Sequence, residues 1–302
     1  MKKILSLLAA VLFAALPAAA AANLTEAEAK VRTQEYKLSG FRSLDISWVY
    51  RVELTQSSKY SVRVEAPEDL MDHLDIKVVG STLKLGTKNT ARSLRLNDRN
   101  NVRVYISMPS VSEIEMSGAS RLTAVGQFNA RKEFKLDMSG STHAEGLYLK
   151  CDQVEIDCSG SSRFDLRGDF DKLELDMSGA SNATLNGDVK NAEIDMSGAA
   201  KLTQHGKIGT LEIEASGSAN YNLSGSLNTL EVEASGAAKI NTLEASANQA
   251  SIRMSGAANA SIDVQKELSV HLDGAASCRY RSADKARIVS QSVGRGASLS
   301  KL

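Results

Sequence analysis

The chain has 302 residues, of which 42% are hydrophobic, yet only 5% are aromatic and three are prolines. A core of this composition must be built from small and aliphatic side chains, which disfavours an immunoglobulin-type sandwich. Lys plus Arg and Asp plus Glu balance at 36 each. A neutral chain has no general attraction to nucleic acid or to an anionic membrane, so we expect no nucleic-acid partner.

Residues 1–22 are typical of a secretory signal peptide. Two lysines precede an apolar run from Ile4 to Leu16, and an A-x-A pattern follows at residues 18–20. The run is short for a membrane-spanning helix, which disfavours the alternative of a membrane anchor. No cysteine near the cleavage site could accept a lipid. We therefore expect an exported protein with no transmembrane segment after signal removal, beginning with a polar lead-in at residues 23–35.

Residues 36–110 are predicted to be rich in β-strands. Apolar and polar side chains alternate along short segments that turn residues separate, as expected of strands with one buried face. These segments are 44–48, 50–54, 60–64, 76–78, 82–85 and 102–106. Residues 67–71 begin with a proline and suit one short helical turn.

From residue 111 onward an internal repeat dominates the sequence. A Ser-Gly pair, or Asp-Gly in the last copy, is followed by two small residues and recurs nine times at steps of 18–22 residues. Glycine accepts the positive φ that a tight corner requires. We therefore predict structural turns at Gly118, Gly140, Gly160, Gly179, Gly198, Gly217, Gly236, Gly256 and Gly274.

Each of these pairs is flanked by two short strands. The residues one and three before the serine are apolar in every copy, and another apolar position follows five residues after it. A unit of about 19 residues cannot bury its own apolar face, whereas stacked copies share one core. The predicted fold is all-β: a parallel β-helix, or solenoid, with about nine coils of 18–22 residues.

A solenoid needs an atypical terminal unit to cover its open core. We therefore interpret residues 36–110 as an N-terminal β-rich cap domain that merges with the first coil near Pro109. The expected organisation is a signal peptide at 1–22, a lead-in at 23–35, the cap at 36–110 and the Ser-Gly solenoid at 111–302.

The three cysteines are predicted to be core residues. Cys151, Cys158 and Cys278 fall at apolar positions of the repeat, and their odd number argues against a disulfide scaffold. A buried free cysteine acts as a small hydrophobic side chain. We expect three free thiols and no catalytic or metal-binding role for them.

Two columns of carboxylates are predicted on one exposed face of the solenoid. The residue two before the serine is acidic in the first seven copies, and the residue four before it is acidic in six of these. The two sets are Glu115, Asp137, Asp157, Asp176, Asp195, Glu214 and Glu233, and Glu113, Glu155, Glu174, Glu193, Glu212 and Glu231. Like charges directly opposite in neighbouring strands are unfavourable, so these columns should hold protons or cations more firmly than isolated carboxylates do.

Weak cation binding is therefore one hypothesis for this face, because arrays of oxygen ligands suit Ca²⁺. The candidate residues are Asp137, Asp157, Asp176, Asp195, Glu155, Glu174 and Glu193. We favour the alternative of a solvated acidic face that discourages edge pairing, because no calcium loop such as G-G-x-G-x-D occurs. We expect no firm metal site and no cofactor.

A third column lies four residues after the serine and is mostly basic or amide. It contains Arg121, His143, Arg163, Asn182, Lys201, Asn220, Lys239, Asn259 and Ser277. One interpretation is a site for an anionic glycan. We favour the other, in which solvated polar groups flank the turn.

No catalytic constellation is apparent. The four histidines are scattered without metal-ligand spacing, and neither G-x-S-x-G nor H-E-x-x-H occurs. A carboxylate that recurs in every coil indicates a ladder and argues against a unique acid-base pair. We expect no enzyme and no catalytic residues.

The order of the segments resembles a known bacterial family. F-R-S-L-D-I-S is followed by V-E-L-T-Q, V-R-V-E-A, G-S-T-L-K-L, V-R-V-Y-I-S-M-P and then repeated M-S-G-A-S units. This pattern is similar to the family known as "putative autotransporter adhesin, head GIN domain", over about residues 36–300. The resemblance implies a β-helical exported protein of Bacteroidota and other Gram-negative bacteria, with no established enzymatic activity and no binding residues to carry over.

Two functions from different classes follow. The first is a non-enzymatic cell-envelope protein, an adhesin-like binding or structural module whose partner is an unknown envelope protein or glycan. It would reside in the periplasm or at the outer-membrane or cell surface. The alternative is a polysaccharide-processing enzyme of β-helix type, such as a Ca-dependent lyase, which would need one irregular coil with a basic residue beside clustered acids.

Overall fold

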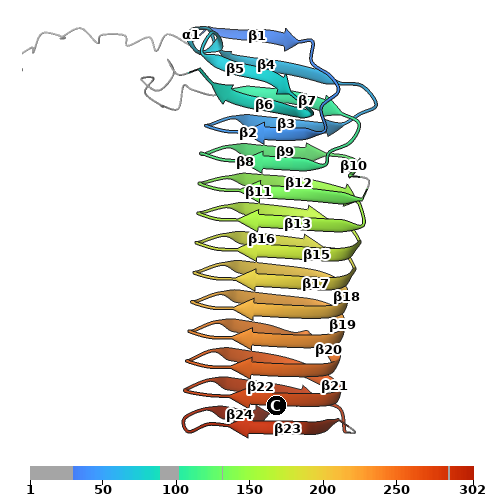
Figure 1. Cartoon of the computed structure of the whole chain (residues 1–302), viewed down its shortest axis with the longest axis vertical. Coiled ribbons are helices and arrows are strands. Elements are labelled where there is room, and N and C mark those ends of the chain that lie inside the picture. Colours follow the sequence, from blue (N-terminus) through green and yellow to red (C-terminus); the bar gives the residue numbers. More distant parts are fainter. Residues whose placement is uncertain (1–29, 89–101, 131, 285) are drawn as a thin grey trace, which may run out of the picture.

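The computed structural model describes residues 30–88, 102–130, 132–284 and 286–302. The predicted signal peptide and most of the lead-in lie outside these ranges. The described chain forms an elongated stack of β-coils with additional strands at its N-terminal end (Figure 1). Its one helix, α1 (Glu68–Met71), has four residues, and no described helix has the length and apolar character needed to span a membrane.

Each coil contributes one strand to each of two broad walls, which are joined at the Ser-Gly corner. The strands confined to wall 1 are β2 (Ser43–Ile46), β8 (Glu113–Met116), β11 (Glu133–Met138), β13 (Gln153–Cys158), β15 (Phe170–Met177), β17 (Val189–Met196) and β23 (Arg287–Val293). Those in wall 2 are β3 (Arg51–Gln56), β9 (Arg121–Val125), β12 (His143–Lys150), β14 (Arg163–Arg167), β16 (Asn182–Asn186), β22 (Ser277–Ser282) and β24 (Ser298–Lys301).

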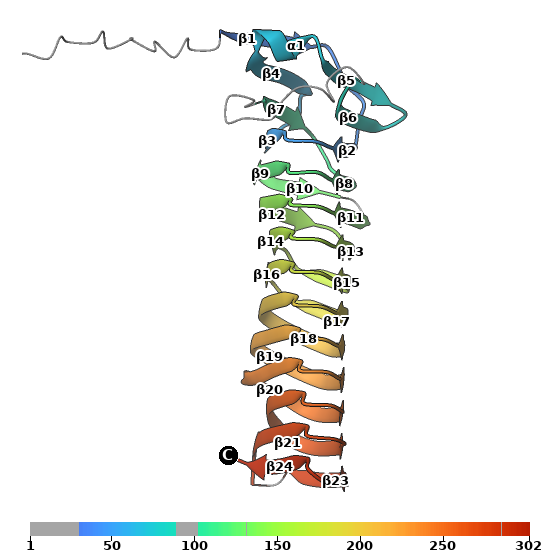
Figure 2. The ribbon, with the colours of Figure 1, turned by 90° about the vertical axis from the view of Figure 1, so that its left-hand side faces the viewer.

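Four longer strands pass from wall 2 through the second corner into wall 1. They are β18 (Lys201–Ala215), β19 (Asn220–Ala234), β20 (Lys239–Met254) and β21 (Asn259–Leu272). A short strand, β10 (Gln127–Asn129), pairs with the end of β12. Figure 2 shows wall 1 edge-on as a straight row of strands, with wall 2 facing it across the core.

The pairing between successive coils is parallel and keeps equivalent repeat positions opposite one another. Ile156 lies opposite Leu175, for example, and Leu175 lies opposite Ile194. The structure therefore confirms the predicted all-β parallel solenoid. It has about 10 turns, close to the nine predicted from the repeat.

Parallel stacking already begins within residues 36–110. β2 and β3 form a coil that pairs directly with β8 and β9. On the other side, β6 (Thr82–Thr87) is parallel to β2, and β7 (Arg103–Met108) is parallel to β3.

Antiparallel strands then end each wall at the N-terminal side. β5 (Leu74–Val79) pairs with β6, while β4 (Ser61–Pro67) pairs with β7 and with β1 (Val31–Tyr36). Leu70 and Met71 of α1 are buried against this end of the core. Because the last strands run antiparallel to the coils, the parallel stack does not continue beyond them.

The core between the walls is filled by the apolar positions of the repeat. All three cysteines are free and buried, as predicted. Burial raises the pKa of the thiols of Cys151, Cys158 and Cys278 to about 12. These thiols are protonated at neutral pH and pack as small hydrophobic groups.

The Ser-Gly corners form a ladder, and each corner requires glycine for two reasons. The nine turn glycines predicted from the sequence have φ between 67° and 77°, a conformation that side chains resist. In addition, Ala199 N donates to Gly179 O at 2.8 Å. A Cβ on Gly198 would lie 2.7 Å from that same oxygen, so the inter-coil hydrogen bond itself occupies the space of a side chain.

The ladder begins at a tryptophan. Trp48 has a φ of 71° and is the one non-glycine residue with positive φ in the described part of the chain. A Cβ on Gly118 would lie 2.4 Å from Trp48 O. Trp48 therefore holds the glycine position of the coil formed by β2 and β3.

A second glycine ladder lies at the opposite corner and was not predicted. Gly168, Gly187, Gly206 and Gly225 have φ between 134° and 155°. A Cβ on Gly187 would lie 1.8 Å from Gly168 O. Both corners of the central coils thus require residues without a side chain.

We expect Gly198→Ala to destabilise the protein more than Gly80→Ala does. Gly80 also has positive φ, at 62°, but a Cβ at this position would meet no atom within 4 Å, so Gly80→Ala carries only the backbone strain of about 1–2 kcal/mol. Gly198→Ala adds the collision with the neighbouring coil, a further ~1–3 kcal/mol. Urea unfolding of both variants measures the difference, and equal losses would contradict the requirement for close stacking.

Candidate functional site

The predicted carboxylates form two columns on the outer face of wall 1. Alternate residues of a strand point to the same side, so the residues two and four before the serine both face outward. The register places Asp137, Asp157, Asp176 and Asp195 opposite one another in successive strands, with Glu155, Glu174 and Glu193 beside them. The candidate cation-binding residues thus lie together on one exposed face.

One of these columns is longer than the sequence indicated and ends in a cation on each side. The acidic column consists of Asp45, Glu115, Asp137, Asp157, Asp176, Asp195, Glu214 and Glu233. Lys84 Nζ donates to Asp45 Oδ2 at 2.8 Å at the N-terminal end. At the other end Arg253 donates to Glu231 at 2.9 Å and to Glu233 at 3.1 Å.

Crowding alters the ionisation of the column. Burial, and then the charge of the neighbouring carboxylates, raises the pKa of Asp137, Asp176 and Asp195. Lys135 offsets part of the charge through an ion pair with Glu155 at 2.6 Å, and Lys172 pairs with Glu174. These three aspartates therefore retain protons more firmly than isolated carboxylates do.

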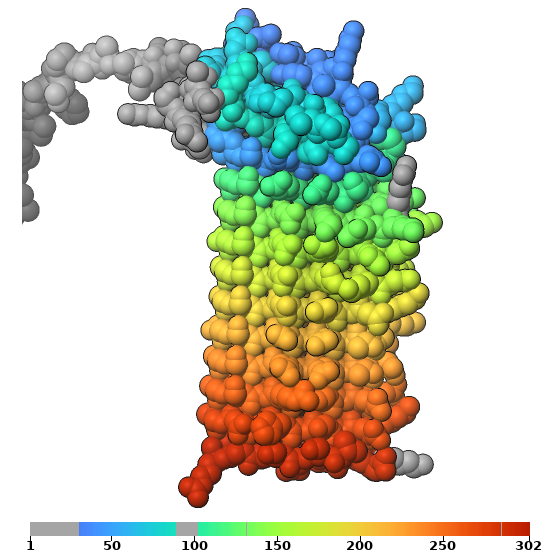
Figure 3. Space-filling model, in the orientation of Figure 1, coloured from blue at the N-terminus to red at the C-terminus, as the bar shows by residue number. Residues whose placement is uncertain are grey.

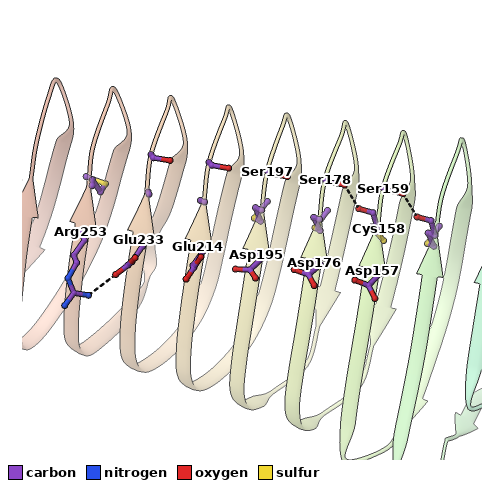
Figure 4. A pocket seen from close by; sticks show the side chains of 18 of the residues that line it. Asp157, Cys158, Ser159, Asp176, Ser178, Asp195, Ser197, Glu214, Glu233 and Arg253 are labelled. Carbon is purple, nitrogen blue, oxygen red and sulfur yellow. Dashed lines mark hydrogen bonds and ion pairs between the residues drawn. The ribbon is translucent and has the colours of Figure 1, made fainter.

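A groove of about 720 Å³ runs along the Ser-Gly corner beside the acidic column. It extends from Glu115 to Asp273, which is roughly 38 Å at a rise of about 4.8 Å per coil. One side is formed by the acidic column and the other by the repeat serines, and Met, Cys and Ala side chains lie between them. Figure 4 shows the carboxylates and serines repeating from coil to coil.

The serine hydroxyls of the groove are partly engaged with the neighbouring coil. Ser159 donates to Met138 O and Ser178 to Cys158 O, each at 3.4 Å. Each hydroxyl oxygen retains acceptor capacity. The groove therefore offers carboxylates, hydroxyls and an apolar strip in the same arrangement over many coils.

This arrangement is suited to repeated weak contacts. Among the described residues, no group of three or more His, Cys, Asp or Glu side chains is placed to hold a metal ion. The carboxylates stand in two parallel columns on one flat face, so a cation beside them would be contacted from one side only and not enclosed by its ligands.

A second groove, of about 760 Å³, lies at the opposite corner beside β10. It is lined by Lys150 and Arg167 together with Asp152, Asp169 and Asp171, and also by Tyr148. Asp171 pairs with Lys190 at 2.6 Å. The sequence did not indicate this cluster, because Lys150 and Asp152 come from one coil and Arg167, Asp169 and Asp171 from the next.

We expect Asp176→Asn to stabilise the protein by about 0.2–1 kcal/mol at pH 7 in metal-free buffer, because it removes one charge from a column of like charges. The raised carboxyl pKa means that the folded state binds more protons than the unfolded chain as the pH falls toward about 4, so acid relieves the same repulsion. The gain should therefore be smaller at pH 5 than at pH 7.

Urea unfolding at the two pH values measures this difference. Asp152→Asn, an exposed carboxylate outside the acidic column, is the matched control and should leave stability nearly unchanged. A loss of stability in Asp176→Asn, or the same gain at both pH values, would contradict the repulsion.

Several crystal structures resemble this chain. A "putative adhesin" from Parabacteroides distasonis has 15% sequence identity and a TM-score of 0.49, covering 91% of this chain and 98% of that chain. A "putative adhesin" from Parabacteroides merdae has 15% identity and a TM-score of 0.48, covering 90% and 96%. A "putative lipid binding protein" from Parabacteroides distasonis has 18% identity and a TM-score of 0.46, covering 90% and 96%.

No functionally curated protein sequence matches the chain. The sequence profile described as "Putative auto-transporter adhesin, head GIN domain" matches residues 40–203 and 173–282. These two matches cover most of the chain and confirm the resemblance seen in the segments between residues 36 and 300. The chain belongs to the family described as "Putative auto-transporter adhesin, head GIN domain".

Proposed function

We propose that this protein is a non-enzymatic, adhesin-like module of the bacterial cell envelope that binds an extended partner along its repeat surface. The observation that carries the proposal is the groove beside the acidic column, which presents carboxylates and hydroxyls in most of its coils over roughly 38 Å. A surface of this kind suits a long ligand that makes many similar contacts. A compact substrate would instead require one unique pocket.

The proposed location is the periplasm or outer surface of a Gram-negative bacterium. The leader at residues 1–22 has the pattern of an exported protein, and the family description refers to adhesins. An envelope glycan or an envelope protein is the corresponding class of partner. We select the glycan for the first test, because its repeating units can follow the repeating coils.

Weak cation binding by the acidic column belongs to the same proposal. Asp176 and Asp195 lie near the centre of the column, where neighbouring carboxylates on both sides raise the cost of full ionisation. Ca²⁺ would lower this cost by occupying several positions without a fixed stoichiometry. It could thereby mediate contact with an acidic glycan.

The test is calorimetric titration of the purified protein with envelope glycans of graded length, with and without Ca²⁺. Affinity should rise with chain length until the glycan spans the groove, and a ligand at about 100 times its Kd should raise the free energy of unfolding by about 2.7 kcal/mol. The double variant Asp176→Asn/Asp195→Asn should weaken binding, whereas Asp69→Asn, at an exposed carboxylate outside both grooves, should not. Absence of binding at every length, or full affinity at one or two sugars, would contradict the proposal.

The second groove favours one other candidate, the polysaccharide lyase. It brings Lys150 and Arg167 near three aspartates, and a basic residue beside clustered acids is the feature that the lyase alternative requires. Ultraviolet absorbance of an unsaturated sugar product, followed in the same glycan titration, distinguishes the two functions. Product formation that Arg167→Ala abolishes would replace the binding module with the enzyme.

A further inference from the structure

Beside the Ser-Gly corner, the outer faces of the two walls carry columns of opposite charge. One row further from the corner, wall 2 also carries the carboxylates Glu53, Glu145 and Asp165. The acidic column lies on wall 1. On wall 2, the first outward residue after the corner lies four positions after the serine, and over eight successive coils these residues form the basic column. It consists of Arg51, Arg121, His143, Arg163, Asn182, Lys201, Asn220 and Lys239. Arg103 of β7 extends this column on the N-terminal side. Figure 3 shows the face of wall 1, on which the side chains of successive coils are aligned in rows along the molecule.

The arginines of the basic column have no partner among the described residues. Arg51, Arg103, Arg121 and Arg163 are exposed, and in the described ranges none of their side chains makes a hydrogen bond or an ion pair. The histidine between two of them, His143, lies 3.5 Å from Glu145. Arg51 lies directly opposite both Arg103 and Arg121, an arrangement of like charges that is unfavourable in a sheet.

The two columns have the same spacing, and in five of their eight coils a carboxylate corresponds to an arginine or a lysine. In each coil the residue of the acidic column precedes the residue of the basic column by six positions. The pairs are Asp45 and Arg51, Glu115 and Arg121, Asp137 and His143, Asp157 and Arg163, Asp176 and Asn182, Asp195 and Lys201, Glu214 and Asn220, and Glu233 and Lys239. In no coil is a carboxylate of the acidic column followed, six positions later, by another carboxylate. In the coil where Arg253 ends the acidic column, the residue six positions later is the neutral Asn259, which lies opposite Lys239.

Both columns also lie beside the same corner, and their residues are separated by the same distance from one coil to the next. A copy of the molecule moved along the normal to the walls would therefore place its acidic column over the basic column of the first copy, with every coil in register. The formal net charge of the chain is zero, so no net repulsion opposes this approach.

We propose that wall 2 of one copy binds wall 1 of a second copy, with the basic column seated on the acidic column and the two solenoids parallel. The contact is heterologous, so each added copy still exposes one free column of each sign and a row of molecules can grow. Individual surface ion pairs are weak. Their repetition in register supplies both affinity and a fixed alignment between the copies.

Sedimentation velocity of the purified protein tests the contact. Association should be strong in about 10 mM salt, where the screening length is about 30 Å, and at least about tenfold weaker in about 1 M salt, where it is about 3 Å. A wild-type protein that remains monomeric in low salt over the whole concentration range would overturn the proposal.

Charge reversal distinguishes this contact from nonspecific attraction. Arg121→Glu/Arg163→Glu and Glu115→Lys/Asp157→Lys change the same two coils on opposite walls, and each variant alone should associate at least about tenfold more weakly. An equimolar mixture should recover association, because each altered face meets its complement. Circular dichroism confirms that both variants are folded.

The matched control is Lys190→Glu/Lys207→Glu. These lysines lie beside the second corner, away from both columns, and the change in net charge equals that of the arginine variant. The control should associate like the wild type. Loss of association in the control, or no recovery in the mixture, would overturn the proposal; binding of an added polyanion by monomeric wild type would instead assign the basic column to an anionic ligand.

Discussion

The close parallel stacking of one coil on the next determines the other features of this molecule. Each corner passes its hydrogen bond to the following coil through a glycine carbonyl, as Gly179 does to Ala199. The space that a side chain would occupy at Gly198 is already filled by that carbonyl. This contact keeps the Ser-Gly corners in line, and coils of different length absorb the extra residues as register shifts elsewhere in the coil, as between Thr242 and Ala247.

Because the coils stack in register, residues of one type at the same repeat position form a column along the molecule. An apolar residue becomes a continuous core, and a carboxylate becomes a line of like charges that the fold cannot disperse. The acidic column consequently ends in an ion pair with Lys84 on one side and with Arg253 on the other, and the pKa values of Asp137, Asp176 and Asp195 are raised. The same geometry gives a long groove on one wall and unpaired arginines on the other, so both proposed interactions arise from the repeat itself.

Much of this could be predicted because the repeat is regular. The spacing of the Ser-Gly pairs predicted the solenoid, the burial of the cysteines and the residues of the acidic face. The coil formed by β2 and β3 was missed because Trp48 stands where the other coils have glycine. The second ladder at Gly168, Gly187, Gly206 and Gly225 had a clear signal, its step of 19 residues. The second groove had none, because its lining residues come from four successive coils and meet only after these have stacked.

Deletion of one repeat tests the central claim most directly. Removal of residues 198–216 joins Ser197 to Gly217 and leaves every ladder in register. Small-angle scattering should then show a folded particle shorter by about 4.8 Å. Removal of residues 207–216 deletes half a coil and should prevent stacking beyond that point. Equal loss of folded structure in both deletions would contradict the claim that close stacking of whole coils determines the structure.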